Sequence, residues 1–263
     1  MNRFEFIEFS INNSIATITL NRTDAGNAFN LQMAQELNRA ATACYYNESV
    51  RAVILNANGK LFSAGGDLAS MAAAGDNADV MLNGIAEQCH AAYSTLSRMR
   101  APVIAAINGA AAGIGFSLSI VADITLASDK ASFLMAYTAA GLSPDGGISF
   151  LLPKIIGIKR AKELALTNRK LSAEKALDWG LINEVLPSDE LQAHALKLAG
   201  TLAKGATQAF GSVKSLFASA HSESLEGQMT LEAAAITKNI KSRDGQEGIQ
   251  AFLERREANF MGG

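Results

Sequence analysis

The first third of the chain contains two kinds of hydrophobic pattern. Segment 15–20, IATITL, places apolar side chains on one face and threonines on the other, which is the two-residue period of a half-buried strand. Segment 51–57, RAVILNA, is apolar enough to form a second strand. Between them, residues 27–45 carry apolar side chains at steps of three and four residues, which predicts a helix. This succession of strand, helix and strand indicates an α/β fold.

A longer helix is predicted from Met81 onwards, because apolar side chains again recur at steps of three and four residues, at Leu82, Ile85, Cys89, Ala92, Leu96 and Met99. Segment 69–84 has no strong pattern, and its path stays open. Residues 101–122 carry no charge and match the length of a membrane span, about 20 residues. Pro102, Asn108 and Gly109 interrupt this stretch, so we expect a buried strand, a turn and a tightly packed helix instead.

The second half of the chain is predicted to be mainly helical. Segment 123–128, DITLAS, is a further strand, and nearly everything beyond Asp145 has a helical pattern. No low-complexity linker separates the two regions. We therefore expect one domain with a core at residues 1–200 and a helical C-terminal region at residues 201–263.

Composition and charge exclude several classes of protein. With 49% apolar and 18% charged residues, the chain is expected to fold into a globular protein. A net charge of −2 with scattered lysines and arginines does not suit nucleic-acid binding. The N-terminus lacks the pattern of a secretion signal, and Cys44 and Cys89 are too few for a disulfide framework. We expect a reduced, cytoplasmic protein that binds neither nucleic acid nor membrane.

Motifs of several enzyme classes are also absent from the sequence. It contains no dinucleotide-binding glycine motif, no phosphate loop, no Gly-x-Ser-x-Gly elbow and no His-Glu-x-x-His. The three histidines, at positions 90, 194 and 221, have no cysteine placed to complete a zinc site. We therefore expect no metal.

Two turns rich in glycine and alanine each follow a predicted strand, at residues 63–68, SAGGDL, and 108–117, NGAAAGIGFS. Small residues let backbone amides approach a ligand, and the second turn opens a helix whose N-terminus favours negative charge. Small residues also permit tight packing. The turns alone are therefore compatible with an anion-binding hole and with ordinary packing.

Six segments occur in an order that is specific to one family: LNRTDAGNAFN, FSAGGDL, APVIAAINGAAAGIGFSLSIVADITLAS, GLSPDGG, LTNRKLSAEKALDWGLINEV and FLERREANF. With them the chain resembles the crotonase family, also called the enoyl-CoA hydratase/isomerase superfamily, over nearly its whole length. The resemblance implies a crotonase-like spiral of repeated ββα units and a C-terminal helical layer that assembles homotrimers or hexamers. It also implies an acyl-CoA thioester substrate, with coenzyme A entering as part of that substrate and no separate cofactor.

The resemblance assigns an anion hole for the thioester enolate to the backbone amides of Gly66 and Ile114. Ile114 replaces the glycine most usual there, but every residue except proline supplies a main-chain N–H. The remaining positions implied by the resemblance follow the coenzyme A moiety: Ala64, Asp67 and Leu68 at the adenine end, Asn27 and Ala28 along the pantetheine, and Phe252 and Arg255 at the nucleotide.

The carboxylates depart from the pattern of the family's hydratases. Those enzymes use two glutamates, and this chain has Ser117 and Tyr137 at the matching positions. Because water addition calls for acid and base groups, the resemblance disfavours an ordinary hydratase. Asp145, in SPDGG, stands where some of the family's isomerases carry a lone catalytic aspartate. Taken alone, SPDGG ahead of an apolar run favours the role of turn residue and helix N-cap for Asp145.

Because the chain resembles this family, we favour Asp145 as the catalytic base of an enoyl-CoA isomerase. Its substrate would be a 3-enoyl-CoA or a ring-derived acyl-CoA from fatty acid or aromatic degradation. One carboxylate can remove a proton from one carbon and return it to another while the anion hole holds the enolate. Leu142, Ile148 and Phe150 would strengthen the base where they point inward. The acyl site is further expected to include His90, Ser117 and Tyr137.

His90 keeps a second function open. Its default role is that of a partly buried structural histidine at the edge of its helix's apolar stripe. The family's aromatic-acyl-CoA dehalogenases carry a catalytic histidine twelve residues before a proline, as His90 precedes Pro102, and a nucleophilic aspartate at the position of Asp145. They carry a halide-binding tryptophan where this chain has Tyr137. A dehalogenase-like hydrolase, a hydratase with unusual carboxylates and a non-catalytic acyl-CoA-binding protein are the alternatives.

Overall fold

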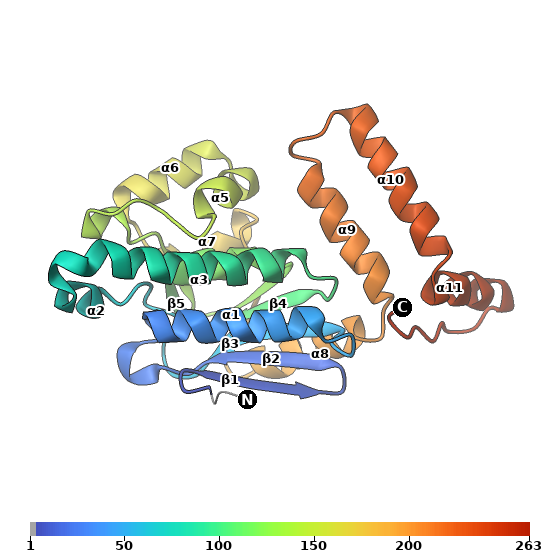
Figure 1. Cartoon of the computed structure of the whole chain (residues 1–263), viewed down its shortest axis with the longest axis horizontal. Helices are drawn as coiled ribbons and strands as arrows, with labels where there is room; N and C mark the ends of the chain where they lie inside the picture. Colours follow the sequence, from blue (N-terminus) through green and yellow to red (C-terminus); the bar gives the residue numbers. More distant parts are fainter. Residues whose placement is uncertain (1–3) are drawn as a thin grey trace.

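The computed structural model describes residues 4–263, whose strands form two sheets (Figure 1). The larger sheet has six strands and the smaller has three. In sheet order, the larger sheet consists of β1 (Ile7–Asn12), β2 (Ile15–Leu20), β3 (Ala52–Ala57), β4 (Val103–Ile107), β6 (Ile124–Ser128) and β9 (Glu184–Leu186). The smaller consists of β5 (Ala110–Ala112), β7 (Ser132–Leu134) and β8 (Leu171–Ser172).

Helices cover both faces of the larger sheet. Its pairings are parallel except for the antiparallel β1–β2 hairpin. Helix α1 (Leu31–Tyr46) packs on one face beside α3 (Ala78–Arg98), and α8 (Leu191–Leu202) packs on the other. The half-buried pattern predicted for β2 is wrong, because Thr19 is buried and Ile15 joins the core under α8. A parallel strand covered on both faces has no solvent side.

The uncharged segment forms the centre of the molecule. It folds into β4, β5 and α4 (Ile114–Val121), and every residue of α4 is buried. The predicted strand, turn and core helix are confirmed, with β5 as an additional short strand. Within residues 4–263, no helix has the length and apolar character that crossing a membrane requires.

The helical expectation beyond Asp145 is correct except for two short strands. The chain continues through α5 (Ile148–Ile156), α6 (Ile158–Thr167) and α7 (Ala173–Asp178). Strand β8 has two residues and β9 has three, and each is added to the edge of a sheet. Segments this short cannot display a hydrophobic period, so their pattern could not reveal them.

The C-terminal helices extend away from the sheets (Figure 1). They are α9 (Thr207–Ser219), α10 (Leu225–Ile240) and α11 (Arg243–Glu254). Two groups connect this extension to the core. The Arg51 guanidinium donates to the carbonyls of Gly205 at 2.7 Å and Phe260 at 2.9 Å. The Lys214 ammonium lies 2.7 Å from the Asp123 carboxylate, and this pair is largely buried.

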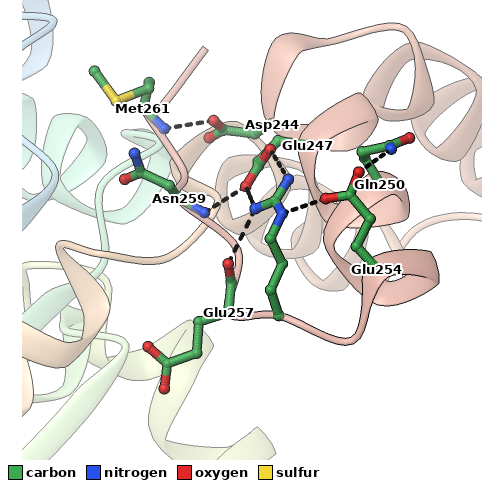
Figure 2. Close-up of polar contacts among 8 residues, drawn as sticks. Asp244, Glu247, Gln250, Glu254, Glu257, Asn259 and Met261 are labelled. Carbon is green, nitrogen blue, oxygen red and sulfur yellow. Dashed lines mark hydrogen bonds and ion pairs between the residues drawn. The ribbon is translucent and has the colours of Figure 1, made fainter.

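The segment after α11 folds back over that helix (Figure 2). The buried carboxylate of Asp244 accepts hydrogen bonds from the amides of Met261 at 2.6 Å and Gly262 at 2.8 Å. Arg256 forms ion pairs with Glu247 and Glu254. The end of the chain is thus attached both to α11 and, through Arg51, to the core.

A buried carboxylate on α1 fixes the start of β1. Glu36 is 2% exposed, and its side chain accepts hydrogen bonds from three successive amides, those of Glu5, Phe6 and Ile7, at 2.8–3.1 Å. Weakening this acceptor leaves donors without a full partner, including the buried amide of Ile7.

We predict that Glu36→Gln lowers the free energy of unfolding by about 1.5–3 kcal/mol, the value of a hydrogen bond to a charged group. Gln35→Ala is the matched control on the exposed face of the same helix, and it should change stability by less than about 0.5 kcal/mol. Urea unfolding followed by circular dichroism measures both. Equal stability of the two variants would contradict the role given to Glu36.

Candidate active site

The two glycine-containing turns lie against each other. The Ala112 amide donates to the Ser63 carbonyl at 2.9 Å, and Ser63 pairs with Ala111 in a short parallel bridge. Gly65 has φ 103°, and a Cβ atom there would lie 3.1 Å from the Ala112 carbonyl oxygen and 3.6 Å from the Gly113 Cα. Only glycine combines this conformation with so close an approach. The packing explanation of these turns is therefore confirmed.

The amides of Gly66 and Ile114 both border one cavity, and neither donates a hydrogen bond to any group within residues 4–263. Ile114 is the first residue of α4, so its N–H has no partner inside the helix. Gly113, with φ 50°, directs the chain into that helix. Two unpaired donors and a helix N-terminus at one cavity are suited to binding an oxyanion.

The cavity has a volume of about 400 Å³ and is mostly apolar. Helix α2 (Leu68–Ala73) and the start of α3 form one wall, and residues 136–145 form another. Its lining comprises Ala64, Gly65, Gly66, Leu68, Met71, Asp79, Leu82, Asn83, Ile85, Ala86, Gly113, Ile114, Ala136, Tyr137, Ala140, Leu142, Ser143 and Asp145. A small-molecule site of this kind typically holds an apolar group and orients it with few polar contacts.

Asp145 places its carboxylate at this cavity and does not cap a helix. Its Oδ1 accepts a hydrogen bond from the Tyr137 hydroxyl at 2.8 Å, and its Oδ2 lies 3.7 Å from Nε2 of His90. Helix α5 begins after Gly147, which provides no side-chain cap. The N-cap interpretation of Asp145 is therefore wrong. Gly146 and Gly147, with φ 65° and 78°, turn the chain between the carboxylate and the helix.

The hydroxyl groups of Ser117 and Tyr137 both form hydrogen bonds with Asp145. The buried Ser117 hydroxyl donates to the Asp145 carbonyl at 2.9 Å and lies 3.0 Å from the Tyr137 hydroxyl. Burial and the nearby Asp145 charge raise the pKa of the Tyr137 phenol. Tyr137 therefore stays protonated and can continue to donate to the carboxylate.

Helix α3 contributes two further contacts. The Gly146 amide donates to Nε2 of His90 at 3.0 Å, and the buried Tyr93 hydroxyl donates to the Ile114 carbonyl at 2.7 Å. Tyr93 was not among the residues predicted from the sequence. The signal was available, because a tyrosine on the buried side of a helix needs a partner for its hydroxyl group.

Comparison with known proteins assigns the family. The chain matches the sequence pattern of the family described as enoyl-CoA hydratase/isomerase over residues 10–263. This chain belongs to the enoyl-CoA hydratase/isomerase family. The fold agrees, since an enoyl-CoA hydratase structure from Polaromonas sp. JS666 superposes with a TM-score of 0.92 at 33% identity, covering 97% of this chain and 99% of that chain. The crotonase resemblance and the α/β crotonase fold are thus confirmed.

Relatives in the enoyl-CoA hydratase/isomerase family carry different reaction names. The trans-2-decenoyl-[acyl-carrier-protein] isomerase of Streptococcus mutans is 34% identical over 98% of this chain and 99% of its own length. The 4-chlorobenzoyl coenzyme A dehalogenase-2 of Arthrobacter sp. is also 34% identical, over 92% of this chain and 88% of its own length. Membership in the family therefore supports an enzyme but leaves its reaction to the chemistry of the site.

The structure brings together part of the residue set that the family resemblance implied. Ala64, Leu68 and Tyr137 line the cavity together with Gly66, Ile114 and Asp145. Ser117 and His90 are outside this lining, but both contact the Asp145 segment, and the His90 side chain is half exposed. Met71 and Asp79 also line the cavity, but they were not among the residues predicted from the sequence. Both lie in segment 69–84, which has no strong hydrophobic pattern.

Asp67 and Asn27 have structural contacts. The Asp67 carboxylate accepts from the Ser70 amide at the start of α2 and pairs with Arg22 at 2.8 Å. Burial raises the pKa of Asp67, but the hydrogen bonds from Ser70 and Arg22 outweigh it and leave the pKa lowered. The Asn27 side chain donates to the backbone carbonyls of Asn58 and Leu61, in the loop that follows β3. Ala28 is buried beside it.

Three other expected residues lie outside the cavity lining. Phe252 is 83% exposed on α11, and Arg255 ends that helix with φ 57°. Of the residues expected to surround Asp145, Ile148 is buried and Leu142 lines the cavity, but Phe150 is 60% exposed and the expectation for it is wrong. Phe150 points outward, where Lys154 lies over its ring. Within residues 4–263, no cluster of three possible metal ligands occurs.

The two glycines after Asp145 give a matched pair of variants. A Cβ atom at Gly146 would lie 2.7 Å from the Ser117 Cβ and 3.0 Å from the Tyr93 ring, whereas one at Gly147 would meet no atom within 4 Å. We predict that Gly147→Ala costs roughly 1–2 kcal/mol, from left-handed backbone strain alone. Gly146→Ala should cost about 1–3 kcal/mol more through overpacking.

Urea unfolding of the two alanine variants provides the measurement. Because the extra atom at Gly146 also displaces the Asp145 segment, only Gly146→Ala should reduce turnover strongly. Equal losses of stability in the two variants would mean that this turn is not packed against Ser117 and Tyr93.

Proposed function

We propose that this protein is an acyl-CoA isomerase that moves a double bond within an enoyl thioester, with Asp145 as its acid–base group. One observation carries the proposal: the Asp145 carboxylate lines the same cavity as the unpaired amides of Gly66 and Ile114. A base and two oxyanion donors at one apolar cavity are the parts that enolate chemistry needs.

In the proposed reaction, the thioester carbonyl oxygen binds between the Gly66 and Ile114 amides. Removing a proton from C2 moves negative charge onto that oxygen, and fixed donors stabilise the charge as it forms. The electron pair is shared along C2, C3 and C4 of a 3-enoyl substrate. Returning the proton at C4 places the double bond between C2 and C3, so no water is added and no group leaves.

Asp145 carries the proton between the two carbons. Its Oδ1 is occupied by the Tyr137 hydroxyl, so we assign the proton transfer to Oδ2. C2 and C4 lie on the same substrate, and one carboxylate above its face can reach both. The Tyr137 hydroxyl fixes the orientation of the carboxylate and prevents it from turning away from the substrate.

A hydratase would need a second acid–base group, and Asp79 is the other carboxylate in the cavity lining. It lies exposed in the first turn of α3, on the wall opposite residues 136–145. Asp79→Asn is therefore the matched control for Asp145→Asn. The isomerase proposal requires Asp79→Asn to retain most of its activity.

A dehalogenase-like hydrolase is the second candidate, and the proximity of His90 to Asp145 favours it. The similarity to the Arthrobacter dehalogenase supports the same candidate. Tyr137 counts against it, because the resemblance places a halide-binding tryptophan there. Halide release from 4-chlorobenzoyl-CoA distinguishes this candidate, since the isomerase should release none.

We predict that Asp145→Asn retains the fold and lowers isomerase turnover by about 10²–10⁴, the usual contribution of a general base. Asparagine keeps an oxygen that accepts from Tyr137 but cannot take up a proton. Turnover of 3-enoyl-CoA thioesters is measured by chromatography with mass detection, which separates an isomer of unchanged mass from a product heavier by one water. Thermal melting provides the control for folding.

Two outcomes would contradict this assignment. Asp145→Asn would retain its specific activity if the carboxylate had no catalytic role. A hydrated product whose formation depends on Asp79 would instead indicate a hydratase. Tyr137→Phe and Ser117→Ala should each reduce turnover far less than Asp145→Asn, because neither side chain transfers the proton.

The anion hole gives a separate prediction at Gly66. Gly66→Pro removes the amide donor and should lower turnover by about 10²–10³, as expected for one lost oxyanion donor. Gly66→Ala keeps the donor and adds only a Cβ atom, which meets the flexible end of Met71 at 2.9 Å. Steady-state kinetics of the two variants, with melting temperatures for comparison, isolate the N–H group. Equal activity of the two variants would exclude this amide from the reaction.

A further inference from the structure

The hydrogen bond between Gly146 and His90 defines the state of the imidazole. The Gly146 N–H donates to Nε2 at 3.0 Å, so Nε2 presents a lone pair. A neutral imidazole has one donor and one acceptor nitrogen, and its proton must then be on Nδ1. In this state Nε2 has no proton to donate to the Asp145 Oδ2, which lies 3.7 Å away. The pair is therefore a close approach without an ion pair.

A second contact acts on the same peptide group. The Ser117 hydroxyl donates to the carbonyl of Asp145, and His90 accepts from the amide of Gly146. These two atoms belong to the one peptide plane that joins Asp145 to Gly146. The plane is thus held at both ends, from α4 by Ser117 and from α3 by His90. Fixing it also fixes the direction in which the Asp145 side chain leaves the backbone.

We propose that His90 is a positioning residue that holds the Asp145–Gly146 peptide through its Nε2 lone pair and exchanges no proton with substrate. The inference rests on the proposed function, in which Asp145 is the base. Gly146 and Gly147 have positive φ angles, and glycines restrict the backbone of a turn less than other residues do. The orientation of this turn therefore depends on the side chains that bind it. A shift of about 1 Å in a catalytic group can cost about 10² in rate.

The same contact depends on the neutral form of the imidazole. Protonated His90 has an N–H at both nitrogens, and one of them would then oppose the Gly146 N–H. The hydrogen bond is lost, and the new cation faces the Asp145 carboxylate at 3.7 Å. The base would be paired with a cation and released from its fixed orientation in a single step. The contact that positions the base therefore requires a neutral His90.

The titratable groups around the pair are Cys89 and Tyr93 on α3, Tyr137 beside the cavity, and Asp145 itself. Burial raises the pKa of the Cys89 thiol and of both tyrosine phenols, so these three groups stay neutral. Among these groups, Asp145 is the one that carries charge next to His90.

The test compares two substitutions at position 90. His90→Gln offers a carbonyl oxygen that can accept from Gly146 and cannot be protonated, whereas His90→Leu offers no acceptor. We expect His90→Gln to keep kcat within a few-fold of the native enzyme, because its amide oxygen replaces the Nε2 acceptor. His90→Leu should lose up to about 10² in kcat with KM nearly unchanged, because the substrate-binding walls are intact. Equal inactivity of the two variants would overturn the proposal.

A second measurement does not depend on activity. Nitrogen-15 NMR of the imidazole rings identifies the tautomer of each of the three histidines, and the His90 signal is the one missing in His90→Gln. We expect the proton on Nδ1 and slow hydrogen exchange at the Gly146 amide. A proton on Nε2 would refute the proposal even with kinetics unchanged. If Asp145→Asn stays active while the tautomer is as expected, the proposed function fails and the His90 contact stands.

Discussion

The approach of the Gly65 backbone to Gly113 is the constraint on which the site depends. It joins a turn that follows β3, in the six-stranded sheet, to a turn that follows β5, in the three-stranded sheet, and opens α4. Any side chain at position 65 would separate the two turns, because a Cβ atom there lies 3.1 Å from a backbone oxygen. The two unpaired amides are held by this backbone contact and by the strand pairing beside it. Their placement therefore depends little on the side chains that line the cavity.

The polar side chains that contact Asp145 from α4 and from position 137 carry neutral hydroxyl groups rather than charges. Ser117 and Tyr137 stand where the resemblance places glutamates, and both contact Asp145. A hydroxyl group can stay neutral in a buried site, where a second carboxylate would repel the first and raise its pKa. Limiting the charge at this wall to one carboxylate suits a reaction that returns its proton to the same substrate.

The sequence predicted those elements whose pattern is long enough to have a period. Helices α1 and α3 and the buried segment of β4 and α4 were found in this way. The two glycine turns were visible from their small residues, and the six ordered segments suggested roles for them and for Asp145. Strands β8 and β9 are too short to show a period. The contacts of Asp145 were beyond sequence reasoning, because Ser117 and His90 meet its peptide from 28 and 56 residues away. Only the tertiary fold shows that the two side chains hold opposite ends of one peptide group.

The hydrogen bonds of the Arg51 guanidinium limit how the C-terminal helices can move. It binds the Gly205 carbonyl just before α9 and the Phe260 carbonyl just after α11. One side chain thereby closes α9, α10 and α11 into a loop that begins and ends at the same point of the core. A segment tethered at one end can swing about that end, whereas this loop is held at both ends by Arg51 and along α9 by the Lys214–Asp123 pair. The entropy gained by detaching a long closed loop grows slowly with its length, so the bonds of Arg51 and Lys214 govern the opening of the whole extension.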